Sequence, residues 1–251
     1  MTSLLPVLMM RHRRVPRSKW VDHITHTGKH WIEHAPTDPN RTRPPPAIGY
    51  HLTFSNSLCG MAVTQGMAPQ VINIGLGIKQ MKVEPKGITV PDFIESLSHK
   101  VCLVFFVLYY SALTTSLKQL TQVELANIGN NPDEVRLRRL CMLLALKDAY
   151  IKAIGQPMGF DYSRLEFDVP NSRVTADGNS IVGWEFRIFG AKLGVARGTK
   201  LKQEEYQCVC AFYRGTPDST FVFHNDPQML ESWVQFINID QMMAVSTKLA
   251  A

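Results

Sequence analysis

One stretch of this 251-residue chain limits its possible folds more than any other, the segment NPDEVRLRRLCMLLALKDAYIKAIG from Asn131 to Gly155. A capping asparagine and a proline open it, two acids follow in the first turn, and a glycine closes it. This pattern predicts one helix over 131–155. Its apolar residues recur at helical spacing on one face, namely Leu137, Leu140, Cys141, Leu144 and Ile151.

Asp148 shares this apolar face, where a carboxylate needs a partner because burying an unpaired charge is costly. Two interpretations remain open from the pattern. Asp148 can form an ion pair with Lys152, which follows four residues later in the favourable acid-first order. Asp148 can instead face a metal or substrate site, which would make this helix one wall of an active site.

Charge and cysteine content narrow the possible functions. The chain has a net charge of +6 and 45% hydrophobic residues, which fits a globular protein with an anionic partner such as a nucleotide, an acidic protein or nucleic acid. Its five cysteines are odd in number and lack metal-type spacing, which predicts reduced thiols and a cytoplasmic location. No secretory signal is evident, and the most apolar stretch, 101–113, is too short to span a bilayer. No membrane partner is predicted.

Strand patterns flank the helical centre of the chain. Alternating apolar residues predict strands at 48–54, 61–64, 71–78, 165–169, 184–188, 206–212 and 220–223. Further helices are predicted at 91–119, at 121–129 with a capping box of Thr121 and Glu124, and from Asp226 onward. The predicted class is therefore α+β, with two small sheets and packed helices. His23, His26 and His30 lack helical support and are predicted to lie in a solvated loop.

The residues after the middle of the long helix resemble a family motif. The segment 146–169, LKDAYIKAIGQPMGFDYSRLEFDV, is similar to the pattern W-x-x-K-E-[AS]-[YF]-x-K-x-x-G of the larger, pseudo-dimeric 4'-phosphopantetheinyl transferases. It is most similar to the eukaryotic aminoadipate-semialdehyde dehydrogenase type. The matching positions are Lys147, Ala149, Tyr150, Lys152, Gly155, Gly159 and the strand 165–167.

Three earlier segments resemble the same family in the same order. Residues 42–44 are similar to a family segment made of a glycine, a basic residue and a proline. Residues 54–60 are similar to the pattern F-N-x-S-H-x-x-G, and residues 74–79 are similar to V-G-[VI]-D-[IV]-E. The resemblance implies a pseudo-twofold arrangement of two halves. Residues 1–90 would be a shortened N-terminal half, lacking about the first strand and helix, and residues 91–251 would be the C-terminal half with the LKDAYIK helix.

The resemblance implies a holo-acyl-carrier-protein synthase type of transferase. Such an enzyme moves the phosphopantetheine arm of coenzyme A onto a serine of an acyl or peptidyl carrier protein, with Mg²⁺ at the pyrophosphate. Asp148 would be the metal ligand and base, and Arg43 and Ser57 would hold the 3'-phosphate of coenzyme A. Lys147 and Lys152 would contact phosphates or fix the helix, Lys152 as part of the catalytic group and Lys147 as part of the coenzyme A site.

Several departures from the family pattern imply a weakened magnesium site. The metal-binding aspartate is replaced by Gly77 and the histidine of the S-H pair by Leu58, and Lys79 stands where some members carry a third acid. The alternative is therefore a catalytically impaired member that binds coenzyme A or a carrier protein without transfer. Restoring the aspartate and the histidine is predicted to raise activity. A nucleic-acid module rests on charge alone and lacks an aromatic-basic motif, so nucleic acid is not the predicted partner.

Overall fold

The computed structural model describes residues 4–34, 46–67, 71–98, 119–156, 159–238, 240–242 and 244. The helices are α1 (Leu4–His12), α2 (Val90–Ser98), α3 (Gln122–Ile128), α4 (Asp133–Ile154) and α5 (Pro227–Glu231). The strands are β1 (Trp20–Ile24), β2 (His30–His34), β3 (Ala47–Ser55), β4 (Leu58–Gly66), β5 (Ile74–Gln80), β6 (Leu165–Asp168), β7 (Arg173–Ala176), β8 (Asn179–Ser180), β9 (Trp184–Arg197), β10 (Lys200–Tyr213) and β11 (Thr220–His224). The predicted α+β class is confirmed.

The strands of the described residues form three sheets rather than the two expected. Their orders are β1-β2-β3-β4, β11-β9-β10-β5 and β6-β7-β8. The second sheet joins distant parts of the chain, because β5 pairs antiparallel with β10 in a register that places Leu76 opposite Cys210. The predicted halves 1–90 and 91–251 therefore share one sheet, and the pseudo-twofold relation between them stays a prediction.

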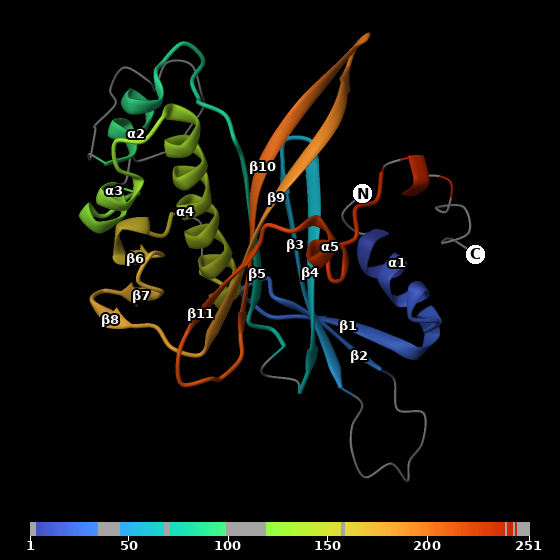
Figure 1. The fold of residues 1–251 in the computed structure, drawn as a ribbon. Coiled ribbons are helices and arrows are strands. Elements are labelled where there is room, and N and C mark those ends of the chain that lie inside the picture. The colour runs from blue at the N-terminus through green and yellow to red at the C-terminus, as the bar shows by residue number, and fades with distance from the viewer. Residues whose placement is uncertain are drawn as a thin grey trace.

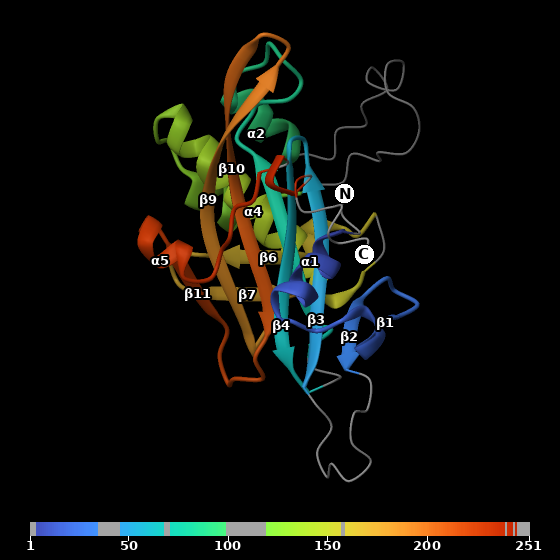
Figure 2. The same ribbon diagram turned by 90° about the vertical axis from the view of Figure 1, so that its right-hand side faces the viewer.

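The sheet β11-β9-β10-β5 is covered on both faces (Figure 1). Helix α4 lies on one face, where its apolar residues pack with Phe186, Ile188 and Val209. The β3–β4 hairpin lies on the other side, where Ala62 packs with residues of β5 and β10. The β9–β10 hairpin extends beyond both layers (Figures 1 and 2). Strand β5, at the edge of its sheet, is thus enclosed between α4 and β3.

Helix α4 matches the predicted helix within two residues at each end. Gly155 ends it in the left-handed conformation at φ 72°, as expected for a glycine stop. The predicted cap is wrong, because Pro132 occupies the N-cap and no side chain caps the helix. The Asn131 amide instead donates to the carbonyl of Ile128 at 3.0 Å. The capping box of α3 is confirmed, with Thr121 and Glu124 bonded reciprocally.

The N-terminal region differs most from the prediction. His23 and His30 lie in the hairpin β1–β2 rather than in a solvated loop, with His23 opposite Trp31. The apolar signal of this hairpin is weak because few of its residues, such as Trp20 and Ile32, are buried. Helix α1 forms although Pro6 lies within it, since a proline in the first turn removes no helical hydrogen bond.

The C-terminal helix is shorter than predicted. Helix α5 stops at Glu231, and three residues expected on its inner side are exposed, namely Met229, Phe236 and Ile237. The apolar stretch 101–113 and the predicted site residue Arg43 lie outside the described residues. None of the described helices combines the length and the apolar character needed to cross a membrane.

Candidate functional site

Asp148 accepts hydrogen bonds from two side chains and forms a longer ion pair with a third. Its carboxylate lies 2.9 Å from the Lys152 ammonium and 3.6 Å from the Lys79 ammonium. The Tyr162 hydroxyl donates to its other oxygen at 3.3 Å. The Asp148 side chain is 13% exposed, whereas those of Lys79 and Lys152 are 32% and 29% exposed. The predicted i,i+4 pair with Lys152 is confirmed, and it belongs to a larger cluster.

Lys152 connects the three elements that build this site. Its ammonium donates to the Thr53 hydroxyl on β3 at 2.8 Å and to the Leu76 carbonyl on β5 at 3.4 Å, in addition to Asp148 on α4. These three acceptors match the three protons of an ammonium group. Lys152 therefore holds Asp148 in place at the point where α4, β5 and β3 meet.

The donor set around Asp148 does not fit a magnesium ion. Two ammonium groups lie within 4 Å of this carboxylate, and two unit charges at that distance interact by about 4 kcal/mol at an effective dielectric constant of about 20. Magnesium takes oxygen ligands, usually including carboxylates. In the part of the chain that the structure describes, no three histidine, cysteine or acidic side chains gather as metal ligands. The magnesium site expected at Asp148 is therefore not formed by the described residues.

Gly77, where the resemblance expects a metal-binding aspartate, lies directly against α4. A Cβ atom at Gly77 would lie 2.1 Å from the Ala145 carbonyl oxygen, and one at Gly75 would lie 2.1 Å from that of Ala149. Both contacts are with backbone atoms, so a side chain at either position would displace the helix. The space that an aspartate would need is filled by the helix itself. Restoring this acid is therefore no longer expected to raise activity.

Lys147 is fully buried beneath the site and is not available to a ligand. Its ammonium forms an ion pair with Glu124 at 2.7 Å, and both side chains are 0% exposed. It also donates to the carbonyls of Gln119, Tyr162 and Leu165 at 2.8 to 2.9 Å. Burial raises the pKa of Glu124 and lowers that of Lys147, since both lose water. This geometry supports the helix-fixing role of Lys147 over a phosphate contact.

Ser57, predicted to hold the 3'-phosphate, lies in the turn between β3 and β4. Its hydroxyl accepts a hydrogen bond from Arg197 at 2.8 Å, and its amide donates to the Tyr206 hydroxyl at 3.2 Å. The neighbouring Asn56 bonds the Gln80 side chain, whereas Asp148 contacts Lys79. Successive residues of a strand point to opposite faces. Ser57 and Asp148 are therefore on opposite sides of β5, and Arg197 is the basic residue that the structure places beside Ser57.

His51 and Lys29 complete the surroundings of Lys152. The His51 ring accepts the amide hydrogen of Leu76 at 3.3 Å, and burial lowers its pKa to about 3. Lys29 reaches from the β1–β2 turn to the carbonyls of Ile74 and Lys152, at 2.5 and 2.7 Å. Burial lowers the pKa of Lys29 to about 8. His51 is thus neutral at physiological pH. Lys29 connects the end of α4 with β5 through its two hydrogen bonds.

The low pKa of His51 predicts acid sensitivity. Between pH 6.5 and about 3 the unfolded chain binds a proton at His51 that the folded chain does not bind, so stability falls as pH decreases. His51→Asn keeps an acceptor for the Leu76 amide but does not titrate. Urea unfolding at pH 7 and pH 4 should show that this variant loses less stability on acidification, by on the order of 2 kcal/mol. Equal losses in both proteins would contradict the prediction.

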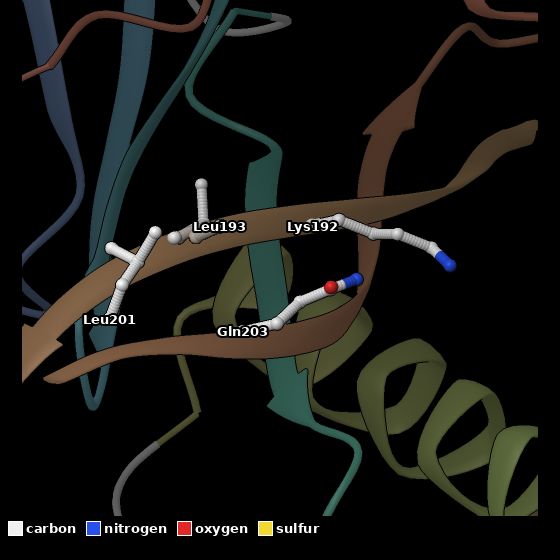
Figure 3. Close-up of a pocket in the computed structure, with 5 residues that line it drawn as sticks. Lys192, Leu193, Leu201 and Gln203 are labelled. Atoms are coloured by element: carbon white, nitrogen blue, oxygen red, sulfur yellow. The ribbon is translucent and has the colours of Figure 1, made fainter.

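A shallow hollow on the β9–β10 hairpin is separate from these residues. It has a volume of about 290 Å³ and is lined by Lys192, Leu193, Gly194, Leu201 and Gln203. Figure 3 shows the Leu193 and Leu201 side chains together on one side and those of Lys192 and Gln203 on the other. None of the predicted site residues lines it. Its one basic group, Lys192, is already paired with Glu205 at 2.9 Å.

The sequence matches no model of a known protein family. A curated protein from Paxillus involutus, 4'-phosphopantetheinyl transferase pptA, is 33% identical over 188 residues, which cover 74% of this chain. The chain belongs to the 4'-phosphopantetheinyl transferase superfamily. It spans 63% of the length of this relative.

In this member of the phosphopantetheinyl transferase superfamily, two ammonium groups lie within 4 Å of Asp148. The resemblance identified Asp148 and Lys152, and it identified Lys79 as a departure from the family pattern. It did not indicate Tyr162, Thr53 or His51. Their signals in the sequence are weak, since each is a single polar residue in or beside a strand. One pattern could have been recognised, because Gly75 and Gly77 match the small residues Ala145, Ala149 and Ala153 of α4.

Proposed function

We propose that this chain binds coenzyme A beside Asp148 and transfers its phosphopantetheine arm to a serine of a carrier protein, as a holo-acyl-carrier-protein synthase does. The observation that carries the proposal is the cluster that Asp148 and Lys152 of the family's motif helix α4 form with Lys79 of β5. It combines one carboxylate with two partly exposed lysine side chains, so it carries a net positive charge next to a proton acceptor. Such a cluster suits a pyrophosphate and a nucleophilic hydroxyl.

The proposed reaction is a phosphoryl transfer. The serine oxygen attacks the phosphorus that bears the pantetheine, a new P–O bond forms, and the bond from that phosphorus to the bridging oxygen breaks. The 3',5'-adenosine diphosphate leaves with the electron pair, and the serine proton passes to Asp148. Lys152 positions this carboxylate, and Lys79 offsets negative charge on the phosphates. No step is assigned to a magnesium ion, because the described residues do not form a site for one.

The proposal is tested by the mass of an apo carrier protein incubated with this chain and coenzyme A. We expect a phosphopantetheine mass increase with the wild-type protein. Asp148→Asn should lower the rate at least 10²-fold, since general-base groups contribute about 10² to 10⁴ in rate. Asp133→Asn is the matched control, because Asp133 is an exposed acid at the other end of the same helix. A folded wild-type protein that transfers nothing would reject the transferase.

A second candidate function is binding without transfer. The observation that favours it is the close contact of Gly77 with α4, which leaves no space for an aspartate side chain at this position. In this case coenzyme A or a carrier protein would bind, and the carrier mass would not change. Calorimetric binding of coenzyme A by a protein that is inactive in the mass assay would favour this candidate over the transferase.

The partners in the proposal are coenzyme A and an acyl or peptidyl carrier protein domain, and the proposed compartment is the cytoplasm. The thiols of the described region support a reducing compartment, because Cys59, Cys141, Cys208 and Cys210 are all free. Burial raises the pKa of Cys208 and Cys210 to about 12. These two thiols are therefore unreactive core residues, as the strand pattern predicts.

A further inference from the structure

Lys79 occupies the position of a third acid in the family pattern that the sequence resembles, and its ammonium faces Asp148 at 3.6 Å. We propose that Lys79 replaces the divalent cation, so that this site binds the diphosphate of its ligand without any metal ion. This inference rests on the proposed function for the identity of the ligand, coenzyme A. It assigns to Lys79 the charge compensation that a bound metal would otherwise supply.

The position of Lys79 supports this role. Lys79 and Gly77 lie on the same face of β5, because side chains alternate along a strand. Gly77 has no side chain, so Lys79 meets Asp148 directly, at 3.6 Å. Among the residues that the structure describes, Asp148 is the one acidic group within 4 Å of this ammonium. The Lys79 side chain is 32% exposed, so part of it faces solvent and can contact an anion.

The neighbouring lysines cannot take over this task. Lys152 uses its three protons on Thr53, Leu76 and Asp148. Lys29 is buried against two backbone carbonyls, and Lys147 is fully buried against Glu124. Among the described residues, Lys79 has one ion-pair contact, at 3.6 Å, which leaves its protons for phosphate oxygens. The division of roles is clear, since Lys152 positions Asp148 and Lys79 binds the anion.

Calorimetry tests the proposal. It measures the affinity for coenzyme A and for inorganic pyrophosphate, first in EDTA and then in excess magnesium. We expect the wild-type affinity for each probe to agree within about twofold between the two buffers. Lys79→Met should lower the affinity for both probes at least tenfold in either buffer. Lys79→Glu places a second carboxylate beside Asp148, so its binding should be lost in EDTA and should return with magnesium.

Lys82→Met serves as the control variant, because Lys82 lies three residues further along and pairs with Glu84 at 2.6 Å. It should bind both probes as the wild type does. Wild-type binding that tightens tenfold or more with magnesium would overturn the proposal, and so would unchanged affinity in a folded Lys79→Met. If Lys79→Met does not fold, the wild-type comparison of EDTA with magnesium decides alone.

The two probes separate this inference from the proposed function. Metal-independent binding of pyrophosphate, weakened by Lys79→Met, supports the cation role of Lys79 even if coenzyme A does not bind. That result would reject coenzyme A as the ligand. Failure of the wild-type protein to bind either probe overturns the cation role itself.

Discussion

Replacing Gly77 by alanine is expected to lower the free energy of unfolding by about 3 kcal/mol, at the upper end of what overpacking costs. The added Cβ would lie 2.1 Å from the Ala145 carbonyl oxygen and 2.9 Å from the Ala149 amide nitrogen. Both are backbone atoms in the middle of α4, which cannot move aside as the end of a flexible side chain can. The helix would have to shift away from β5, and the contacts around Asp148 would loosen with it.

Urea unfolding of Gly77→Ala beside Gly190→Ala measures this effect. Gly190 lies on β9 in the same sheet, and the nearest atom to a Cβ there is 3.8 Å away, so its substitution should change stability by less than about 1 kcal/mol. Equal stability of the two variants would show that α4 is not held at backbone contact. The double variant Gly77→Asp with Leu58→His is likewise expected to be destabilised, and no more active than the wild type.

Replacing Lys147 by methionine is expected to cost about 3 to 5 kcal/mol, the range observed when one partner of a buried ion pair is removed. Glu124 would remain buried without its cation, although it would keep bonds from the amides of Thr121 and Phe167. Three carbonyls that accept from Lys147 would also lose a donor. The pair links α3, α4 and β6, so its loss affects the packing of all three elements.

A double-mutant cycle in urea identifies the origin of this loss. Lys147→Met with Glu124→Gln should recover part of the stability, because no unpaired buried charge remains. Arg138→Met is the control, since its pair with Glu134 is exposed and should contribute less than about 1 kcal/mol. A fully stable Lys147→Met that loses affinity for coenzyme A would contradict the structural role and would support a phosphate contact.

The elements with strong local signals were predicted well. Helix α4 carries its start, its periodicity and its glycine stop within the segment itself, and the capping box of α3 is a local arrangement of four residues. The elements with weak local signals were predicted poorly. The β1–β2 hairpin has few buried residues, and α5 ends early because Phe236 and Ile237 find no core to pack against.

The site was predicted only in part, for the same reason. The pair of Asp148 with Lys152 lies within one helix turn, so spacing alone predicts it. Tyr162 is 14 residues from Asp148, and Thr53 is 99 residues from Lys152. Contacts of such separation depend on how α4, β5 and β3 pack together. No local pattern contains them.

The sequence by itself determined the superfamily, the α+β class and the motif helix with Lys147, Asp148 and Lys152, because these follow from spacing along the chain. Only the tertiary structure decided what the charged residues do. Lys147 is removed from solvent by Glu124, and Lys79 is brought to Asp148 by the packing of β5 against α4. Burial and distance set the role of a charge, and neither is a property of the chain before it folds.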